Sequence, residues 1–312
     1  MRRTGRPPGR PVDHPRRARL VYLRRRVTAV VVPAVVAVVL LLILDGQAPG
    51  SRAARTLGTG TGDTARSAPR SAISPPGGAG GGGFSSELRQ NERILAYTSY
   101  IAAGSTRHRE IALTFDDGPS PFTLPILAVL KRYRAKATFF ETGRQVSTHP
   151  RFTAALARAG MTIGDHTQTH PPMAALSSGE QALQIDQAAQ AIRAAGAPRP
   201  LVWRPPYGSF NATTLELLRP RAMVMTLWTV DTSDYARPGV KRIIYTALSG
   251  ARPGAIILFH DGGGNRSQTV AALPRILERL RQHGYRLVTV PQLLRDDPPP
   301  PGQAPPRNLS GS

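Results

Sequence analysis

Short apolar runs alternate regularly with helical segments between residues 111 and 290. The runs, each typical of a buried strand, are IALTF (111–115), KATFF (136–140), MTIG (161–164), LVW (201–203), MVMTLWTV (223–230), AIILF (255–259) and RLVTV (286–290). Such alternation predicts a parallel sheet with helices outside it. Seven strands in about 205 residues favour an α/β fold in the form of a distorted (β/α) barrel, with an open doubly wound sheet as the alternative.

The N-terminal region has the pattern of a membrane anchor. Residues 1–26 contain ten arginines, and residues 27–44 contain no charge. Eighteen helical residues span about 27 Å, close to the hydrocarbon thickness of a bilayer. The positive-inside rule predicts a cytoplasmic tail (1–26), a single-pass signal anchor (27–44) and an extracytoplasmic remainder. A cleaved signal peptide is the alternative, and Arg24, Arg25 and Arg26 weakly resemble a twin-arginine signal.

Two low-complexity segments flank the predicted folded domain, which covers residues 90–295. Residues 45–89 are rich in small and polar residues and include the run GGAGGGG, so a flexible linker is expected. Residues 296–312 are rich in proline, which predicts a disordered tail. Because the chain has no cysteine, the extracytoplasmic domain must be stabilised by its own core and by any bound metal rather than by disulfides.

The net charge of +22 is concentrated at the N-terminus. Residues 1–26 contribute +9 of it, and the remaining excess consists mainly of arginine. A basic chain can bind nucleic acid or an anionic surface, but the sequence contains no nucleic-acid motif. We therefore expect no nucleic-acid partner, and no segment indicates an obligate protein partner.

Clusters of polar residues follow five of the predicted strands. They are DDGP after 111–115, DHTQTH after 161–164, RPPYG after 201–203, DTSDY after 223–230 and HDGGG after 255–259. In α/β folds the carboxyl ends of the strands carry the functional site. We therefore expect these five clusters to converge on one site.

The adjacent carboxylates Asp116 and Asp117 repel each other, so at least one needs a proton, an arginine or a metal ion as a partner. A solvated turn is the alternative interpretation.

His166 and His170 are four residues apart, and one carboxylate added to them gives a His₂Asp set with an open position, as in catalytic zinc sites. The helical HExxH zinc motif is excluded, because its glutamate is absent and prolines follow His170. One aspartate would bind metal, and the other would take a proton from the metal-bound water.

In this order and spacing, TFDDGP, HTQTH, RPPYG, DTSDY and LFHDG resemble the five motifs of the polysaccharide deacetylases of carbohydrate esterase family 4, which include chitooligosaccharide deacetylases of the nodulation type. The resemblance extends from about residue 110 to 290. It implies a distorted barrel and one divalent metal ion, with zinc expected first and cobalt, manganese or nickel as alternatives. It also implies removal of N- or O-acetyl groups from cell-wall glycans.

The resemblance assigns a role to each motif residue. It makes Asp116 the general base, Asp117, His166 and His170 the metal ligands, Arg204 the partner that keeps Asp116 ionised, His260 the general acid, and Asp234 the partner that aligns His260. The Tyr207 N–H would contribute to an oxyanion hole, and Leu258 and Trp228 would shape the acetyl pocket. The fourth motif usually ends in Asp-Trp, whereas this chain has Tyr235, which can wall a sugar groove.

These features predict a membrane-tethered, metal-dependent deacetylase of N-acetylated glycan. Peptidoglycan or a chitin-like glycan is the expected substrate, with peptidoglycan first because the tether would keep the domain near the cell wall. Two alternatives remain open: an O-acetyl xylan or polysaccharide esterase, and a non-catalytic wall-binding protein on the same fold.

Overall fold

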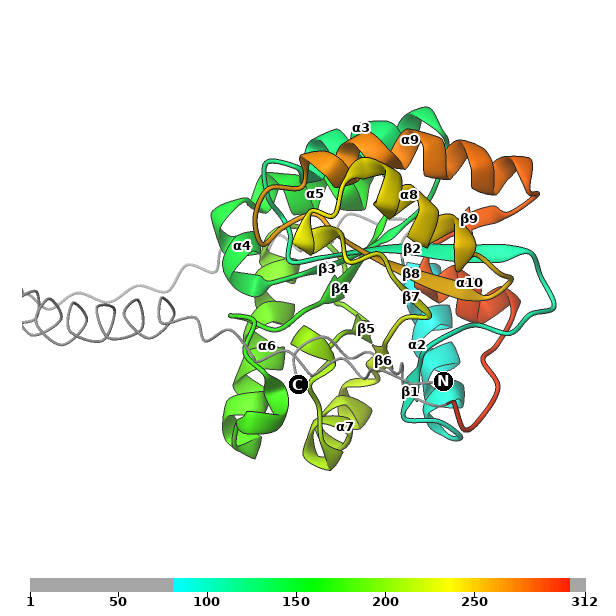
Figure 1. Ribbon diagram of the computed structural model, residues 1–312. Helices are drawn as coiled ribbons and strands as arrows, with labels where there is room; N and C mark the ends of the chain where they lie inside the picture. The colour runs from blue at the N-terminus through cyan, green and yellow to red at the C-terminus, as the bar shows by residue number, and fades with distance from the viewer. Residues whose placement is uncertain (1–80, 304–312) are drawn as a thin grey trace, which may run out of the picture. The chain divides into compact units, whose positions relative to one another are not determined.

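The computed structural model describes residues 81–303, and within them nine strands form one sheet (Figure 1). The strands are β1 (Tyr100–Ile101), β2 (Glu110–Asp116), β3 (Thr138–Glu141), β4 (Thr162–Asp165), β5 (Val202–Trp203), β6 (Val224–Thr226), β7 (Val230–Asp231), β8 (Ala255–His260) and β9 (Arg286–Val288). All eight strand pairings in this part of the chain are parallel. The predicted parallel α/β fold is confirmed.

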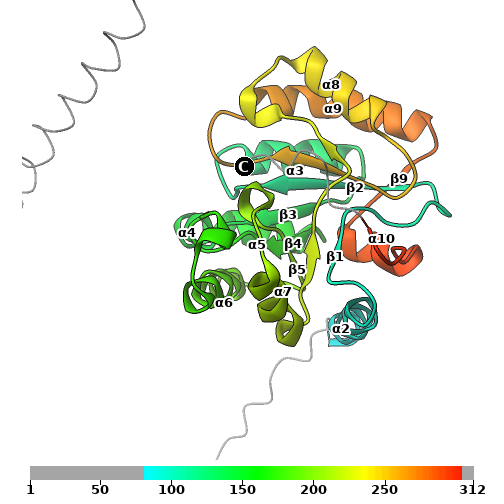
Figure 2. The same ribbon diagram turned by 60° about the horizontal axis from the view of Figure 1, so that its bottom comes forward.

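The sheet is curled, as Figures 1 and 2 show. The strand order is β1-β6-β5-β4-β3-β2-β8-β7, and β9 pairs with the first residues of β2. Between β6 and β7 the chain crosses from one end of this order to the other. There the Leu227 N–H donates to the Ile101 carbonyl, and the Thr229 N–H donates to the Ile256 carbonyl. This arrangement is consistent with the predicted distorted barrel.

Nine α-helices surround the sheet in the described part of the chain. They are α2 (Gly81–Leu95), α3 (Thr123–Arg132), α4 (Gly143–Thr148), α5 (Pro150–Arg158), α6 (Ser178–Ala194), α7 (Ala212–Leu218), α8 (Val240–Ser249), α9 (Ser267–Gln282) and α10 (Val290–Asp296). Helices α3, α8 and α9 lie together over the β2–β8 side of the sheet (Figures 1 and 2). Short 3₁₀ turns, including Pro206–Gly208 and Asp234–Ala236, occupy loops beyond the strands.

The alternation of side chains along β2 and β8 determines which residues face the barrel interior. Every residue of β2 is buried. Ile111, Leu113 and Phe115 belong to the core between sheet and outer helices, whereas Ala112 belongs to the inner core. Side chains two residues apart on a strand point to the same side, so Thr114 and Asp116 face the barrel interior together with Ala112. On β8 the same alternation places His260 on the inner side, directly beside Asp116 in the register.

The segment predicted as one strand, 223–230, forms two strands, because the chain turns away between them to cross the sheet. Strand β1 was not predicted. Helix α2 begins at residue 81, so the last residues of the expected linker (45–89) are helical. Beyond α10, Asp297 accepts hydrogen bonds from Arg107, and the Gln303 side chain accepts the Ala102 N–H at 2.6 Å. The start of the expected disordered tail (296–312) is therefore bound to the domain.

Within residues 81–303, no helix has both the length and the apolar character needed to cross a bilayer. The predicted tail (1–26) and signal anchor (27–44) lie outside the described residues.

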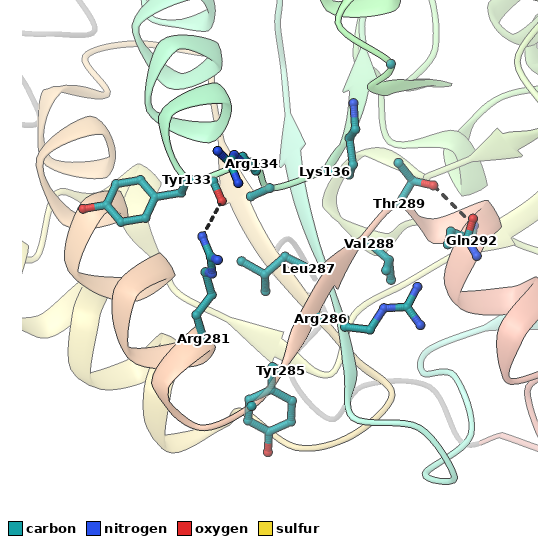
Figure 3. A pocket seen from close by; sticks show the side chains of 13 residues that line it. Tyr133, Arg134, Lys136, Arg281, Tyr285, Arg286, Leu287, Val288, Thr289 and Gln292 are labelled. Carbon is teal, nitrogen blue, oxygen red and sulfur yellow. Dashed lines mark hydrogen bonds between the residues drawn. The ribbon is translucent and has the colours of Figure 1, made fainter.

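A basic cavity of about 690 Å³ lies at the amino-terminal ends of the strands, beside β9 (Figure 3). Two of its cations cap helix ends, and a third, Arg286, pairs with Glu110 and Asp296. Arg281 donates to the Tyr133 carbonyl at the end of α3, and Lys136 donates to the Ala159 carbonyl at the end of α5. Because these carbonyls carry the negative end of the helix dipole, the two cations have a structural role there.

Candidate active site

The first motif places two carboxylates at the end of β2 in different environments. Asp116 is buried, and its Oδ1 accepts a hydrogen bond from Arg204 Nη1 at 2.8 Å. Asp117 has a φ of +74°, a left-handed conformation that aspartate tolerates better than most residues. Its Oδ1 lies 3.0 Å from His170 Nε2 and 3.5 Å from His166 Nε2. An arginine therefore partners one carboxylate, and two imidazoles face the other.

Arg204 is fully buried, and each of its three side-chain nitrogens donates to a partner. Nη1 also donates to Thr114 Oγ1, while Nε and Nη2 donate to the carbonyls of Thr226 and Leu227 at 2.9 and 3.0 Å. The guanidinium lies 4.1 Å from the Phe140 ring centroid. A buried charge that is paired and held by several hydrogen bonds in this way can orient Asp116 rigidly.

A tight turn after β4 aims both histidines at Asp117. Thr167 and His170 have φ values of +69° and +64°, and the His170 N–H donates to Thr167 Oγ1. His166 Nδ1 lies 2.8 Å from the Arg204 carbonyl. Because a carbonyl only accepts, Nδ1 is the donor, and Nε2 is the ring nitrogen that faces Asp117.

Asp117, His166 and His170 fit a divalent metal ion. Their candidate ligand atoms lie within 4.8 Å of one another. Asp117 Oδ1 is buried and accepts no hydrogen bond among the described residues. Two imidazole nitrogens and one carboxylate oxygen match the donors that zinc and similar ions prefer.

His260 and Asp234 form the opposite side of the site. His260 Nδ1 lies 2.7 Å from Asp234 Oδ1, and the His260 N–H donates to Asp234 Oδ2 at 3.0 Å. Burial alone would lower the pKa of His260, but the hydrogen bond and charge of Asp234 raise that pKa to about 9. Burial would raise the pKa of Asp234, yet the bond with His260 leaves it below its ordinary value. The geometry therefore favours an imidazolium–carboxylate pair.

Asp116, the three candidate metal ligands and His260 line one cavity of about 560 Å³ at the carboxyl ends of the strands. Trp228 and Leu258 are buried in its wall, whereas Tyr207 and Tyr235 are 45% and 41% exposed at its rim. The Tyr207 ring contacts the His170 ring with centroids 4.6 Å apart, and Tyr235 contacts His260 at 5.2 Å. Tyr207 has a φ of +59°, an unusual conformation for tyrosine that is typical of functional loops.

The structure thus brings together all the predicted site residues, either in the cavity wall or, for Arg204 and Asp234, directly behind it. Sequence reasoning missed Gly263 and Arg266, which also line the cavity. Their segment, GGGNR, reads as an ordinary turn. The three consecutive glycines after His260 were the available signal that the backbone passes close to another group there.

Comparisons with known proteins identify the family. The family model described as polysaccharide deacetylase matches residues 103–224. A peptidoglycan-N-acetylglucosamine deacetylase of Bacillus cereus is 40% identical over 189 residues, which cover 59% of this chain and 88% of that protein. The chain belongs to the polysaccharide deacetylase family. A chitooligosaccharide deacetylase of Bradyrhizobium sp. is 36% identical to this family member over 59% of this chain and 90% of that protein.

Solved structures of the family share the fold. A crystal structure of a peptidoglycan N-acetylglucosamine deacetylase aligns with a TM-score of 0.62 at 32% identity, covering 67% of this chain and 98% of that one. A CE4 family pseudoenzyme from Bacillus anthracis aligns with a TM-score of 0.59 at 32% identity, covering 62% of this chain and 68% of that one. The family therefore includes proteins with active sites and proteins with inactive ones. Activity has to be inferred from the individual residues of the site.

Proposed function

We propose that the chain is a metal-dependent hydrolase that removes N-acetyl groups from a cell-wall glycan, with peptidoglycan as the first expected substrate. The observation that carries the proposal is the convergence of a carboxylate, a His₂Asp set and an imidazolium in one cavity. Amide hydrolysis needs an activated water, a polarised carbonyl and a proton for the leaving nitrogen. The named relatives act on peptidoglycan and chitooligosaccharide, which supports the substrate class.

Asp116 has the position of a general base. Its Oδ1 is fixed by Arg204, and its Oδ2 lies 3.8 Å from His166 Nε2, on the side of the predicted metal ligands. In the proposed reaction, Asp116 accepts a proton from the water that attacks the acetyl carbonyl carbon. Because Arg204 is itself held by main-chain carbonyls, the base cannot turn away from the water.

His260 has the position of a general acid. Its Nδ1 is engaged by Asp234, so Nε2 is the ring nitrogen available to the cavity. With a pKa raised to about 9, His260 carries a proton at neutral pH. It donates that proton to the amide nitrogen as the C–N bond breaks, and the products are acetate and a free amino sugar.

Asp117, His166 and His170 would hold the metal ion. When bound, a zinc, cobalt, manganese or nickel ion would act as a Lewis acid toward the acetyl oxygen and lower the pKa of water. The rim residue Tyr207 would direct its N–H toward the same oxygen as part of an oxyanion hole.

The cavity wall suits an N-acetyl sugar. Leu258 and Trp228 offer a small buried apolar surface for the acetyl methyl group. Tyr207 and Tyr235 present exposed rings on which sugar rings can pack. Tyr207 would contact the glycan on one side of the scissile bond, and Tyr235 would contact it on the other.

The alternative of a non-catalytic wall-binding protein is favoured by one observation, the similarity to a family pseudoenzyme. Against it, the side chains that we propose as base, metal ligands and acid all line one cavity. Acetate release by the full-length chain should be compared on peptidoglycan, chitooligosaccharides and acetylated xylan. We expect release from the first two; release from xylan alone would support the esterase alternative, and no release from any of the three would support the binding protein.

We further propose that residues 27–44 anchor the chain in the cell membrane with the catalytic domain outside. The proposal rests on the uncharged run and on the arginines that precede it. The full-length chain should fractionate with membranes, and protease added to intact protoplasts should release the domain. A mature protein beginning near residue 50 and free in the medium would indicate a cleaved signal instead.

A further inference from the structure

The start of α9 contacts the acid side of the site through two buried side chains, Arg266 and Thr269. Neither belongs to the five motifs. We propose that both are positioning residues: Thr269 fixes the Asp234 carboxylate behind His260, and Arg266 fixes Tyr235 and the loop after His260. This inference rests on the proposed function, because it concerns the same reaction.

Thr269 completes the hydrogen bonding of Asp234. Its Oγ1 donates to Asp234 Oδ2 at 2.6 Å, and the same oxygen accepts the His260 N–H at 3.0 Å. Asp234 Oδ1 is left for His260 Nδ1. The Asp234 carboxylate thus accepts three hydrogen bonds, from Thr269 Oγ1, the His260 N–H and His260 Nδ1, and these hold it in one orientation. Without the hydroxyl, Oδ2 keeps only the main-chain donor, and the plane of the carboxylate becomes free to tilt away from the imidazole.

Arg266 connects two loops of the cavity. Its Nε donates to the Gly262 carbonyl at 2.6 Å, and its Nη1 donates to the Tyr235 carbonyl at 3.3 Å. The residue is only 4% exposed although it lines the cavity. Tyr235 directly follows Asp234, and Gly262 lies two residues after His260. The guanidinium therefore ties together the chain segments that carry the acid and its partner.

The glycine next to this guanidinium leaves no room for a side chain. Gly263 has a φ of +71°, and a Cβ there would lie 2.5 Å from Asp117 Oδ2 and 3.2 Å from Arg266 Nη2. The loop thus passes tightly between the metal-ligand side and Arg266. Arg266 supports the loop at Gly263 on the side away from Asp117. Removal of the Arg266 guanidinium should therefore make Tyr235 at the cavity rim more mobile and leave the buried Asp116 in place.

The two residues should therefore affect different kinetic constants. Thr269→Val removes the hydroxyl with little change of shape, so kcat should fall about 10-fold while KM changes little. Thr269→Ser keeps the hydroxyl and should stay near the parent. Arg266→Met frees the Tyr235 rim, so KM should rise about 5- to 10-fold with a smaller effect on kcat. Arg266→Lys, which cannot reach both carbonyls, should show the same direction of change.

The experiment measures acetate release from chitooligosaccharide by full-length parent and variants, with thermal unfolding to confirm that each is folded. Ser267→Ala, an exposed change in the same helical turn, is the matched control and should leave both constants unchanged. Thr269→Val and Arg266→Lys that are folded and kinetically equal to the parent would overturn the proposal. A Thr269→Ser variant as impaired as Thr269→Val would also overturn the role of the hydroxyl.

A second measurement does not depend on turnover. In nitrogen-15 histidine NMR spectra, the His260 Nδ1 proton bonded to Asp234 should resonate far downfield in the parent and in Thr269→Ser, and should move upfield in Thr269→Val. An unmoved resonance in Thr269→Val would contradict the positioning role. A parent that releases no acetate but shows this shift would reject the proposed function and leave the inference about Thr269 standing.

Discussion

The two ends of the strands carry cavities of similar size, about 560 Å³ at the carboxyl ends and about 690 Å³ at the amino ends, and both are lined by charged side chains. At the carboxyl ends the charges are buried and paired with one another, as in Arg204–Asp116 and His260–Asp234. At the amino ends the cations are exposed: Arg281 and Lys136 donate to main-chain carbonyls, and Arg286 pairs with the buried Glu110. Charge alone does not distinguish a catalytic site. The difference lies in burial: both partners of each ion pair are largely buried at the carboxyl ends, whereas Arg286 is exposed in its pair with Glu110.

The largest effect is expected when a histidine at the carboxyl ends of the strands is replaced and compared with a histidine replaced at the amino ends. His170→Ala leaves only two of the three predicted ligands, so metal content and measurable turnover should both be lost. His283→Ala, an exposed histidine just after α9 at the other end, is the control and should behave like the parent. Metal analysis by mass spectrometry beside acetate release gives the answer. Full metal occupancy in His170→Ala would show that the three residues are not the site.

A smaller effect is expected from the charge behind His260. Asp234→Asn keeps the size of the side chain but removes the carboxylate that raises the pKa of His260 to about 9. In the parent, the acid is protonated below that pKa, so kcat should decline as the pH rises through about 9. In the variant the decline should begin at lower pH, and kcat at neutral pH should fall by roughly 10²-fold. Identical alkaline limbs in the two pH profiles would exclude His260 as the acid.

The smallest effect is expected at the amino-terminal cavity. Arg281→Ala removes an exposed cation from the end of α3, so stability should fall by only about 0.3–1 kcal/mol and kcat should not change. Thermal unfolding and acetate release measure the two quantities separately. A large loss of activity with intact stability would give this cavity a role in the reaction and remove the contrast between the two ends.

Much of the fold could be predicted because buried parallel strands have continuous apolar sequences, as in residues 111–115 and 255–259. What could not be predicted depends on distant contacts. Strand β1 has only two residues and exists because it pairs with β6. The split of 223–230 follows from hydrogen bonds to Ile101 and Ile256, far away in the sequence. Gln303 binds the domain through the main chain of Ala102, although its neighbours read as a disordered tail.

The candidate site shows the same division. Asp116, His170 and His260 could be predicted, because motifs at strand ends converge by the topology of the fold. Arg266 and Thr269 could not, because each acts through a hydrogen bond to a residue more than 30 positions away. Nothing in GGGNRSQT distinguishes those side chains from the solvated residues beside them. Their burial is decided by packing rather than by local sequence.

We propose Asp116 as the general base, and this role can be tested directly. Asp116→Asn keeps the shape of the side chain but removes the proton acceptor, and the three metal ligands remain. Acetate release from peptidoglycan and bound metal should be measured on the same preparations of parent and variant. We expect unchanged metal content and a kcat lowered by about 10²- to 10⁴-fold. A variant that retains its metal and deacetylates at the parental rate would exclude Asp116 as the general base.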